Sequence, residues 1–236
     1  MASSDKKTIF IDARWINLFG IGRYTEEILL NLSKLISKDI NIKFLTLDSS
    51  PDLNLGSNFT QIKRNILWFG FAEQIKLSLL LFKLKPNIAH FLNFNIPVIW
   101  FLFSRSKKIV TIHDLTLLDF KTTDKKIWQI KGLIYEIKNI VTKFILYLAI
   151  KKSTYVLTPS EYVRKEIIKK YKVNPNKVVA THLGLGHRFV PNIIEDKTKT
   201  KEILNKLGIN KSYIIYVGNV YPHKNLPRLV IAFSKL

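Results

Sequence analysis

Short apolar runs bounded by turn residues alternate with longer amphipathic stretches along most of the chain. The runs are rich in Ile and Val and show little two-residue alternation, which is typical of strands buried on both faces of a parallel sheet. They lie at residues 8–12, 42–47, 88–92, 109–113, 154–158 and 178–181. Helices are expected between them at residues 22–37, 67–85, 126–152 and 161–171. This alternation predicts an α/β fold with helices on both faces of the sheet.

The pattern changes near residue 190. A polar stretch at 192–200 and a short helical stretch at 199–207 precede one more apolar run, SYIIYVG, at 212–218. A single strand and the helix after it cannot bury a core of their own. We therefore expect a complete first domain, a linker with a short helix, and only the first βα unit of a second domain. The expected boundaries are 1–190, 191–211 and 212–236.

The strongly positive charge of the chain indicates an anionic partner. The formal net charge is +21 and the isoelectric point is about 10.0. Such a field attracts nucleic acid, anionic lipid or polyanionic substrates, although a bias toward Lys, Ile and Asn codons could produce part of the excess. No helix-turn-helix, zinc or aromatic RNA-binding signature accompanies the charge, so nucleic acid is not an expected partner. An anionic membrane surface stays open as a partner.

The number of cysteines and the length of the apolar stretches indicate the cellular compartment of the protein. The chain has no cysteine, which excludes disulfides and thiolate chemistry. Its first residues are too polar for a secretory signal core. The longest apolar stretches, at 96–103 and 144–150, are shorter than the roughly 20 residues of a membrane span. We expect a cytoplasmic protein, with a peripheral position on the inner face of the membrane as an open addition.

Two glycines stand one residue apart after the first apolar run. Gly20 and Gly22 are followed by Arg23 and a helical stretch, in the segment FGIGRYTEEI. The dinucleotide fingerprint G-x-G-x-x-G starts in the same way, but Thr25 replaces its third glycine and Asp48 lies too far along the chain. A nicotinamide site is the weaker interpretation. The pattern favours a glycine turn at a helix N-terminus that binds phosphate, and a plain packing turn is the alternative.

A histidine and an aspartate end the fourth apolar run, in the segment TIHDL. His113 and Asp114 thus lie at the carboxyl end of a buried strand, the edge at which open α/β sheets bind ligands. His113 could donate a hydrogen bond to a sugar hydroxyl or transfer a proton, and Asp114 could orient it or cap the next helix. A purely structural pair is the alternative.

The segment VGNVYPHKN, at 217–225, repeats the pattern of the first turn. Gly218 follows an apolar run and Lys224 lies near a helix start, where an ammonium can neutralise phosphate; a solvated surface lysine is the alternative. The histidines show no metal-binding spacing, and no D-x-D pair is present. We therefore expect neither a metal nor a cofactor.

The segment 67–85 has one strongly apolar helical face. Lysines border this face, as in helices that lie on a membrane surface. The face consists of Trp68, Phe71, Ile75, Leu79 and Phe82. A core helix whose lysines extend to solvent at its margin is the alternative.

Four motifs in this order resemble one family, the retaining glycosyltransferases with the two-Rossmann (GT-B) fold. They are IFIDARWINLFGIGRYTEEILLNL, IVTIHDLTLLDF, VLTPSEYVRKEIIKKYKV with KVVATHLGL, and YIIYVGNVYPHKNLPRLVIAF. The similarity extends over nearly the whole chain from residue 8 and is to glycosyltransferase family 4, which includes bacterial mannosyltransferases of polysaccharide and lipopolysaccharide assembly. It implies a Rossmann-like N-terminal domain and only the first βα unit of a second Rossmann-like domain, because the acidic E-x7-E element would lie beyond Leu236.

The resemblance also implies a reaction and a site. A sugar, with mannose as one candidate, would pass from a nucleotide diphosphate sugar to a glycan or lipid-linked acceptor, with retention of configuration and without a metal. Lys224 and helix N-termini would stabilise the leaving diphosphate. The implied catalytic residues are His113 and Asp114, and the implied substrate-binding residues are Gly20, Gly22, Arg23, Gly218, Asn219 and Lys224.

One departure from the family pattern concerns the diphosphate. Many relatives carry arginine where this chain has Asn219, so one of the two usual cations would be absent. A second function also stays open: a non-enzymatic basic α/β module that binds an anionic membrane or a partner subunit.

Overall fold

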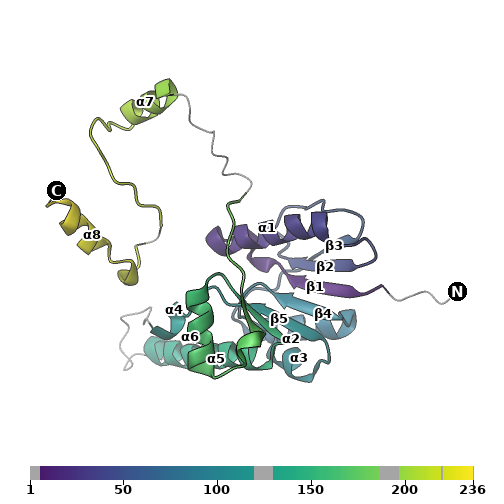
Figure 1. Cartoon of the computed structure of the whole chain (residues 1–236). Helices are drawn as coiled ribbons and strands as arrows, with labels where there is room; N and C mark the ends of the chain where they lie inside the picture. The colour runs from purple at the N-terminus through teal and green to yellow at the C-terminus, as the bar shows by residue number, and fades with distance from the viewer. Residues whose placement is uncertain (1–5, 120–129, 187–196, 219, 236) are drawn as a thin grey trace. The chain divides into compact units, whose positions relative to one another are not determined.

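The computed structural model of the chain describes residues 6–119, 130–186, 197–218 and 220–235. The chain divides into two compact units, Met1–Gly184 and Leu185–Leu236. The described sheet lies entirely in the first unit (Figure 1).

The first unit is built on one parallel sheet. Its strands are β1 (Thr8–Asp12), β2 (Asn41–Thr46), β3 (Phe59–Lys63), β4 (Ile88–Phe91), β5 (Lys107–Thr111), β6 (Tyr155–Thr158) and β7 (Val178–Ala180). Within the described residues they follow the order β3-β2-β1-β4-β5-β6-β7, and every neighbouring pair is parallel. The order reverses between β1 and β4, which is the point where open α/β sheets form a ligand crevice beyond the carboxyl ends of their strands.

Helices cover both faces of this sheet. The helices of the first unit are α1 (Phe19–Leu35), α2 (Phe71–Leu84), α3 (Val98–Phe103), α4 (Thr116–Asp119), α5 (Ile130–Lys152) and α6 (Glu161–Tyr171), with 3-10 turns η1 (Arg14–Asn17) and η2 (Pro175–Lys177). Helix α1 lies on one face and α2, α3 and α5 on the other (Figure 1). Two apolar clusters, one on each face, make up the core.

The side chains of β1 show how one strand serves both clusters. Phe10 packs into the cluster that contains α2, α3, α5 and α6, whereas Ile11 packs into the cluster beneath α1. Both side chains are completely buried. Successive side chains of a strand point to opposite faces, so a strand covered on both sides needs an unbroken apolar run.

The predicted α/β class with a Rossmann-like sheet is confirmed, and all six strands predicted from 8–12 to 178–181 are present. One strand and one core helix were missed. Strand β3 has the sequence FTQIK, whose polar residues conceal it. Helix α3 lies in the stretch 96–103, which is too short to show a helical period.

The second unit contains helices but no described strand. Helix α7 (Lys197–Lys206) matches the helix predicted at 199–207, and η3 (Pro222–Lys224) and α8 (Leu226–Phe233) follow. The strand predicted at 212–218 is not formed in the described residues of this segment. The physical reason is the lack of a partner strand there, because a strand exists only by hydrogen bonding to a neighbour.

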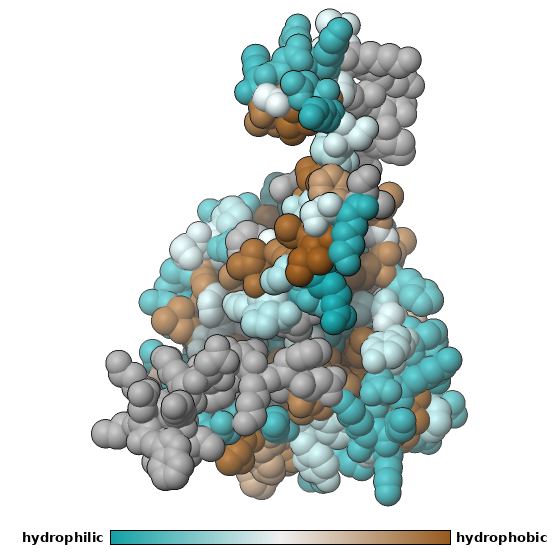
Figure 2. Space-filling model, turned by 90° about the vertical axis from the view of Figure 1, so that its left-hand side faces the viewer, coloured by the Kyte–Doolittle hydropathy of each residue, from teal (hydrophilic) through white to brown (hydrophobic). Residues whose placement is uncertain are grey.

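Apolar side chains also reach the surface. On the face shown in Figure 2 they form several groups between hydrophilic side chains. In the first unit, the exposed large apolar side chains of α2 are Phe71, Ile75, Leu79 and Phe82. The apolar face predicted for 67–85 therefore points outward, except Trp68, which precedes the helix and stacks on Trp15 at 4.9 Å between ring centroids.

Candidate functional site

The connection from β1 to α1 is longer than a glycine turn. The 3-10 turn η1 follows β1, and α1 begins at Phe19, so that Gly20 and Gly22 both lie in the first turn of the helix. Neither glycine has a positive φ. The expected glycine turn before a helix at residue 22 is therefore wrong, although a helix N-terminus does follow the first strand.

The two glycines have different roles in this turn. A Cβ on Gly22 would collide with the backbone carbonyl of Ile16 and lie 3.0 Å from the carbonyl oxygen of Trp15. Gly22 thus lets the first turn of α1 pack directly on η1. The Cβ position of Gly20 has no atom within 4 Å, so this side of the helix N-terminus is open. Arg23 is exposed one residue after Gly22.

A buried arginine links β1 to α2. The guanidinium of Arg14 donates to both carboxylate oxygens of Asp12, at 2.8 and 2.7 Å, and its Nη2 lies 2.8 Å from Oε1 of Glu73. Arg14 also donates to the carbonyl of Ile66 at 3.0 Å. Burial lowers the pKa of Arg14, but Asp12 and Glu73 outweigh that effect and raise the pKa above its ordinary value. Arg14 therefore stays charged, and the pairing compensates its burial.

Glu73 extends this network to the loop after β4. Its carboxylate accepts two hydrogen bonds from Nδ2 of Asn95, at 2.8 and 3.0 Å, and one from the backbone N–H of Phe69 at 2.7 Å. Burial raises the pKa of Glu73, while Arg14 and Asn95 act in the opposite direction. Because every one of these partners is a donor, the carboxylate form fits the geometry. The network connects the end of β1, the loop after β4 and the first turn of α2 to one another.

An aromatic contact places the N-terminal part of α1 beside the end of β5. The rings of Tyr24 and His113 meet edge to face, with 5.0 Å between centroids and 87° between planes. The Tyr24 hydroxyl lies 3.2 Å from Oγ1 of Thr111, the last residue of β5. Since Tyr24 follows Arg23 directly, this contact brings the predicted residues Gly20, Gly22 and Arg23 to the same edge of the sheet as His113.

The hydrogen bond of His113 defines its tautomer. Nε2 donates to the carbonyl of Leu92 at 2.9 Å, because a carbonyl oxygen can only accept. Burial lowers the pKa of His113, against the raising effects of the Leu92 carbonyl and of Asp114. The ring is therefore neutral near pH 7 and keeps Nδ1 as an acceptor. This tautomer would accept a hydrogen bond from a sugar hydroxyl rather than donate one through Nε2.

Asp114 points to the next helix. Its Oδ1 accepts a hydrogen bond from the backbone N–H of Thr116, the first residue of α4, at 2.9 Å. A carboxylate in this place accepts a hydrogen bond from a backbone N–H at the helix start and interacts favourably with the positive end of the helix dipole. Of the two roles considered for Asp114, capping the next helix is the one that this hydrogen bond supports.

A second histidine supports the site from below. His90, in β4, is buried and lies with Nε2 3.0 Å from Oγ1 of Thr111, the hydroxyl that also contacts Tyr24. Burial lowers the pKa of His90 to about 4. His90 and Thr111 are therefore neutral polar supports that hold Tyr24 in position against His113.

Three buried polar atoms near this edge have no hydrogen-bond partner within the described residues. They are Nε1 of Trp68 and the Oδ1 atoms of Asn93 and Asn95. Both asparagines follow β4. Such orphaned atoms are rare in folded proteins and call for a donor or acceptor from water or a ligand.

The remaining predicted site residues do not belong to the first unit. Gly218 and Lys224 are exposed in the unit Leu185–Leu236, with Lys224 at the end of η3. Asn219 lies outside the described residues. Their predicted roles toward a diphosphate stay predictions.

Sequence reasoning missed several residues of the crevice. Arg14 and Glu73 carry its buried charges, and Tyr24, Thr111 and His90 support its histidine. The one signal available was the charged pair in IDAR, directly after a buried run, because charges are buried only when they are paired. Nothing local in the sequence marks Thr111 or His90.

Two general features of the described residues complete the site. No group of three His, Asp or Glu side chains comes close enough there to hold a metal ion. Among the same residues, none of the helices has the length and apolar character needed to cross a membrane.

The first unit is a Rossmann-like α/β domain whose strand order reverses between β1 and β4. Residues 20–186 match Glycosyltransferase Family 4. Because this match covers more than half of the chain, the chain belongs to that family.

Two known proteins resemble the chain more distantly. The O-antigen chain mannosyltransferase B of Escherichia coli is 22% identical over 156 residues, which are 64% of this chain and 35% of that protein. The crystal structure of a glycosyltransferase from Rickettsia africae ESF-5 aligns over 88% of this chain and 51% of that one, with 11% identity and a TM-score of 0.44. The chain thus spans about a third of the mannosyltransferase and about half of the solved structure.

Proposed function

We propose that the chain is the acceptor-side part of a retaining glycosyltransferase that uses a nucleotide diphosphate sugar. The observation that carries this proposal is the contact between Tyr24 and His113, which joins the open N-terminus of α1 to the end of β5. Family membership supports sugar transfer as the reaction. The similarity to an O-antigen chain mannosyltransferase favours mannose as the sugar and a polysaccharide or lipid-linked glycan as the acceptor.

The first wall of the site would bind phosphate. The first N–H groups of α1 have no intrahelical partner, and the helix dipole favours an anion at this end. The open space at Gly20 would admit a phosphate oxygen, and Arg23 would add a positive charge. His113 would accept a hydrogen bond from a hydroxyl of the transferred sugar through Nδ1, and Asp114 would keep α4 in place beneath it.

A second set of residues, in the unit Leu185–Leu236, would bind the leaving diphosphate. We assign this role to Lys224, and we propose Gly218 and Asn219 as further residues that bind the donor. A lysine there would stabilise the negative charge that develops as the glycosidic bond to the diphosphate breaks. We propose that these residues belong to a second domain that begins in 212–236, after the linker 191–211 and the first domain 1–190.

The phosphate wall is tested with Arg23→Ala. The assay uses protein expressed from the whole reading frame and measures transfer of radiolabelled mannose from GDP-mannose to an isolated lipid-linked glycan. Loss of one charge-assisted contact predicts a drop in kcat/KM of about tenfold to a hundredfold. The matched control is Lys34→Ala, an exposed cation in the last turn of the same helix. Wild-type activity in both variants would contradict phosphate binding by Arg23 and would favour a role in packing alone for the glycine segment.

Two further measurements test the reaction itself. Retention predicts that NMR of the product shows the anomeric configuration of the donor. The metal-independent mechanism predicts an unchanged rate in the presence of EDTA. Inversion of the product would exclude the retaining mechanism, and inhibition that Mg²⁺ reverses would exclude the metal-independent one.

A second candidate function is peripheral binding to an anionic membrane. Helix α2 supports it, because its apolar face with Phe71, Ile75, Leu79 and Phe82 is exposed and Lys76 and Lys83 are exposed beside it. The net charge of +21 acts in the same direction.

Vesicle flotation tests this candidate. The protein should float with vesicles that contain phosphatidylglycerol, less so at high salt, and Leu79→Ser should weaken flotation. Leu35→Ser, at an exposed leucine of α1, serves as the control. Indifference of the wild-type protein to anionic lipid would remove the membrane from the proposal.

A further inference from the structure

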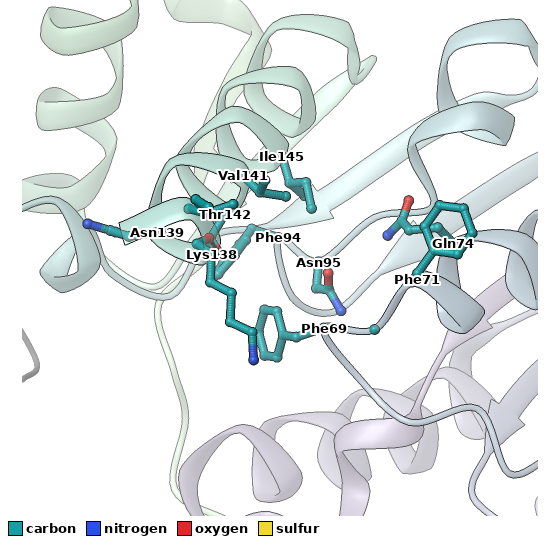
Figure 3. A pocket seen from close by; sticks show the side chains of 12 residues that line it. Phe69, Phe71, Gln74, Phe94, Asn95, Lys138, Asn139, Val141, Thr142 and Ile145 are labelled. Atoms are coloured by element: carbon teal, nitrogen blue, oxygen red, sulfur yellow. Dashed lines mark hydrogen bonds between the residues drawn. The ribbon is translucent and has the colours of Figure 1, made fainter. Parts of the chain in front are cut away.

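A pocket of about 600 Å³ opens beside the crevice, between the N-terminus of α2, the loop after β4 and the middle of α5 (Figure 3). This volume is in the range of small-molecule sites. Aromatic and aliphatic side chains form most of its wall. They are Phe69, Phe71, Phe94, Ile137, Val141 and Ile145.

Three polar side chains of the pocket, Gln74, Asn95 and Thr142, form hydrogen bonds within the protein, although Oδ1 of Asn95 has no partner within the described residues. Gln74 donates to the carbonyl of Ile96 at 3.1 Å and accepts from the N–H of Val98 at 2.8 Å. Asn95 gives Nδ2 to Glu73, and Thr142 donates to the carbonyl of Lys138 at 2.7 Å. The pocket therefore offers an apolar surface with few polar groups for a hydroxylated ligand.

One wall residue has an unusual backbone. Phe69 has φ 59°, in the left-handed region that favours glycine, although it carries a bulky aromatic ring. The hydrogen bond from its N–H to Glu73 holds this conformation, and its ring packs against Trp15 at 6.0 Å and Phe94 at 6.2 Å between centroids. Strain of this kind persists only where surrounding contacts enforce it, and it concentrates at ligand-binding sites.

The pocket has one charged lining residue, and it is a cation. Lys138 extends from α5 toward Phe69 at the pocket mouth, while Asn139 extends away from it (Figure 3). The other lining residues include no carboxylate. An apolar wall with a single ammonium at its rim is complementary to an apolar chain with an anionic head.

We infer that this pocket binds the hydrocarbon chain of a lipid-linked acceptor, with the phosphate of that acceptor beside Lys138. This inference rests on the proposed glycosyltransferase function; it favours the lipid-linked acceptor over a free polysaccharide and assigns a binding site to its lipid. The Arg14–Glu73–Asn95 network joins the pocket wall to η1, which directly precedes the helix N-terminus proposed to bind phosphate, so a bound lipid would hold its attached sugar next to that end of α1.

The first test measures binding without any transfer reaction. Octyl, decyl and dodecyl phosphate, each below its micelle-forming concentration, are titrated into the chain by calorimetry. Affinity should rise by roughly fourfold for each methylene buried, about 0.8 kcal/mol, until the pocket is full. Dodecanol should bind more weakly than dodecyl phosphate, and inorganic phosphate should not compete at equal concentration.

Two variants with matched controls locate the site. Val141→Glu places an anion in the wall and should weaken dodecyl phosphate by roughly tenfold or more, whereas Ile140→Glu, also exposed on α5 but outside the pocket, should not. Lys138→Gln should weaken it by roughly threefold, and Lys143→Gln should leave it unchanged. Equal effects of variant and control would overturn the inference, as would the absence of dodecyl phosphate binding.

Two comparisons separate this inference from the proposals on which it rests. If dodecyl phosphate binds as expected but no sugar is transferred, the pocket assignment stands and the glycosyltransferase function fails. If the protein transfers sugar to a lipid-free glycan but Val141→Glu does not change transfer to the lipid-linked one, the pocket assignment fails alone. Flotation with vesicles without binding of monomeric dodecyl phosphate would show a membrane surface instead of a lipid pocket.

Discussion

The segments 8–35 and 212–233 have nearly the same sequence pattern and very different structures. Each contains an apolar run, a glycine, a cation and a helix. In the first, β1 lies between β2 and β4 in the sheet, and α1 packs over it. In the second, residues 212–217 are exposed and form no strand within the described residues, and α8 has no buried residue.

The difference shows what an apolar run can specify. Ile11 in the first segment is completely buried, whereas Ile215 in the second is 74% exposed. Both are β-branched residues in apolar runs, and only the first has parallel neighbours on both sides. β-propensity describes how well a residue fits a pleated, half-buried surface, so it has no effect where that surface is missing.

Removal of the buried arginine should have the largest effect. Arg14→Leu leaves Asp12 and Glu73 buried without their shared cation and should lower the free energy of unfolding by about 3–5 kcal/mol. Arg228→Leu, in the exposed helix of the second segment, should change it by less than about 0.5 kcal/mol. Urea denaturation measures both. A loss below about 1 kcal/mol for Arg14→Leu would mean that the network is not formed in solution.

The two isoleucines test the comparison directly. Ile11→Ala should cost about 2–5 kcal/mol, because it leaves a cavity between β1 and α1. Ile215→Ala should be within about 0.5 kcal/mol of the wild type. Thermal and urea unfolding of both variants provide the measurement. Similar losses in the two variants would contradict the contrast between a packed and an unpacked segment.

The next largest effect should be a loss of stability at acid pH, caused by buried His90 in β4, the strand beside β1. The pKa of His90 is about 4 in the folded chain against 6.5 for the unfolded side chain, so the unfolded state binds more protons between these values. Stability should therefore fall as the pH falls from 6.5 to 4, by about 3 kcal/mol, with His113 acting in the same direction.

The variant His90→Gln isolates this contribution. It should flatten the dependence of the unfolding free energy on pH between 6.5 and 4, whatever its effect at neutral pH. His182→Gln, at an exposed histidine, serves as the control for the loss of one imidazole. A slope that is the same in both variants would argue against a buried neutral His90.

Substitution of the glycines in the two segments should give the smallest difference in the free energy of unfolding. Gly22→Ala forces η1 and α1 apart and should cost about 1–3 kcal/mol. Gly218→Ala meets only the hydroxyl end of Tyr216, a side chain that can move, and should cost less than about 0.5 kcal/mol. Gly20→Ala, with open space around it, should be neutral or slightly stabilising for a helix residue. Urea denaturation again measures the free energy of unfolding, and equal costs for Gly22 and Gly20 would show that the close approach to Ile16 is not maintained.

Burial explains which strands could be predicted from the sequence and which could not. Runs such as 8–12 are apolar because both of their faces are covered, and this leaves a clear pattern. Strand β3 lies at the sheet edge, where one side has no neighbour and polar residues are accepted, so the pattern is lost. Within the candidate site, Arg23 was proposed from the glycine pair at a helix N-terminus and His113 from a strand end, whereas Tyr24, which contacts His113, was not predicted.

The sequence by itself determined the α/β class, six of the strands and the helix N-terminus after β1, because apolar periodicity and strand-end chemistry are local. Tertiary structure alone decided that Gly22 is a packing glycine, that Arg14 is buried between two carboxylates and that Tyr24 joins α1 to His113. These features depend on residues that are 2 to 89 positions apart in the chain, from Asp12 and Arg14 to Tyr24 and His113. Only the closing of the sheet between β1, β4 and β5 brings the more distant of these residues within contact distance.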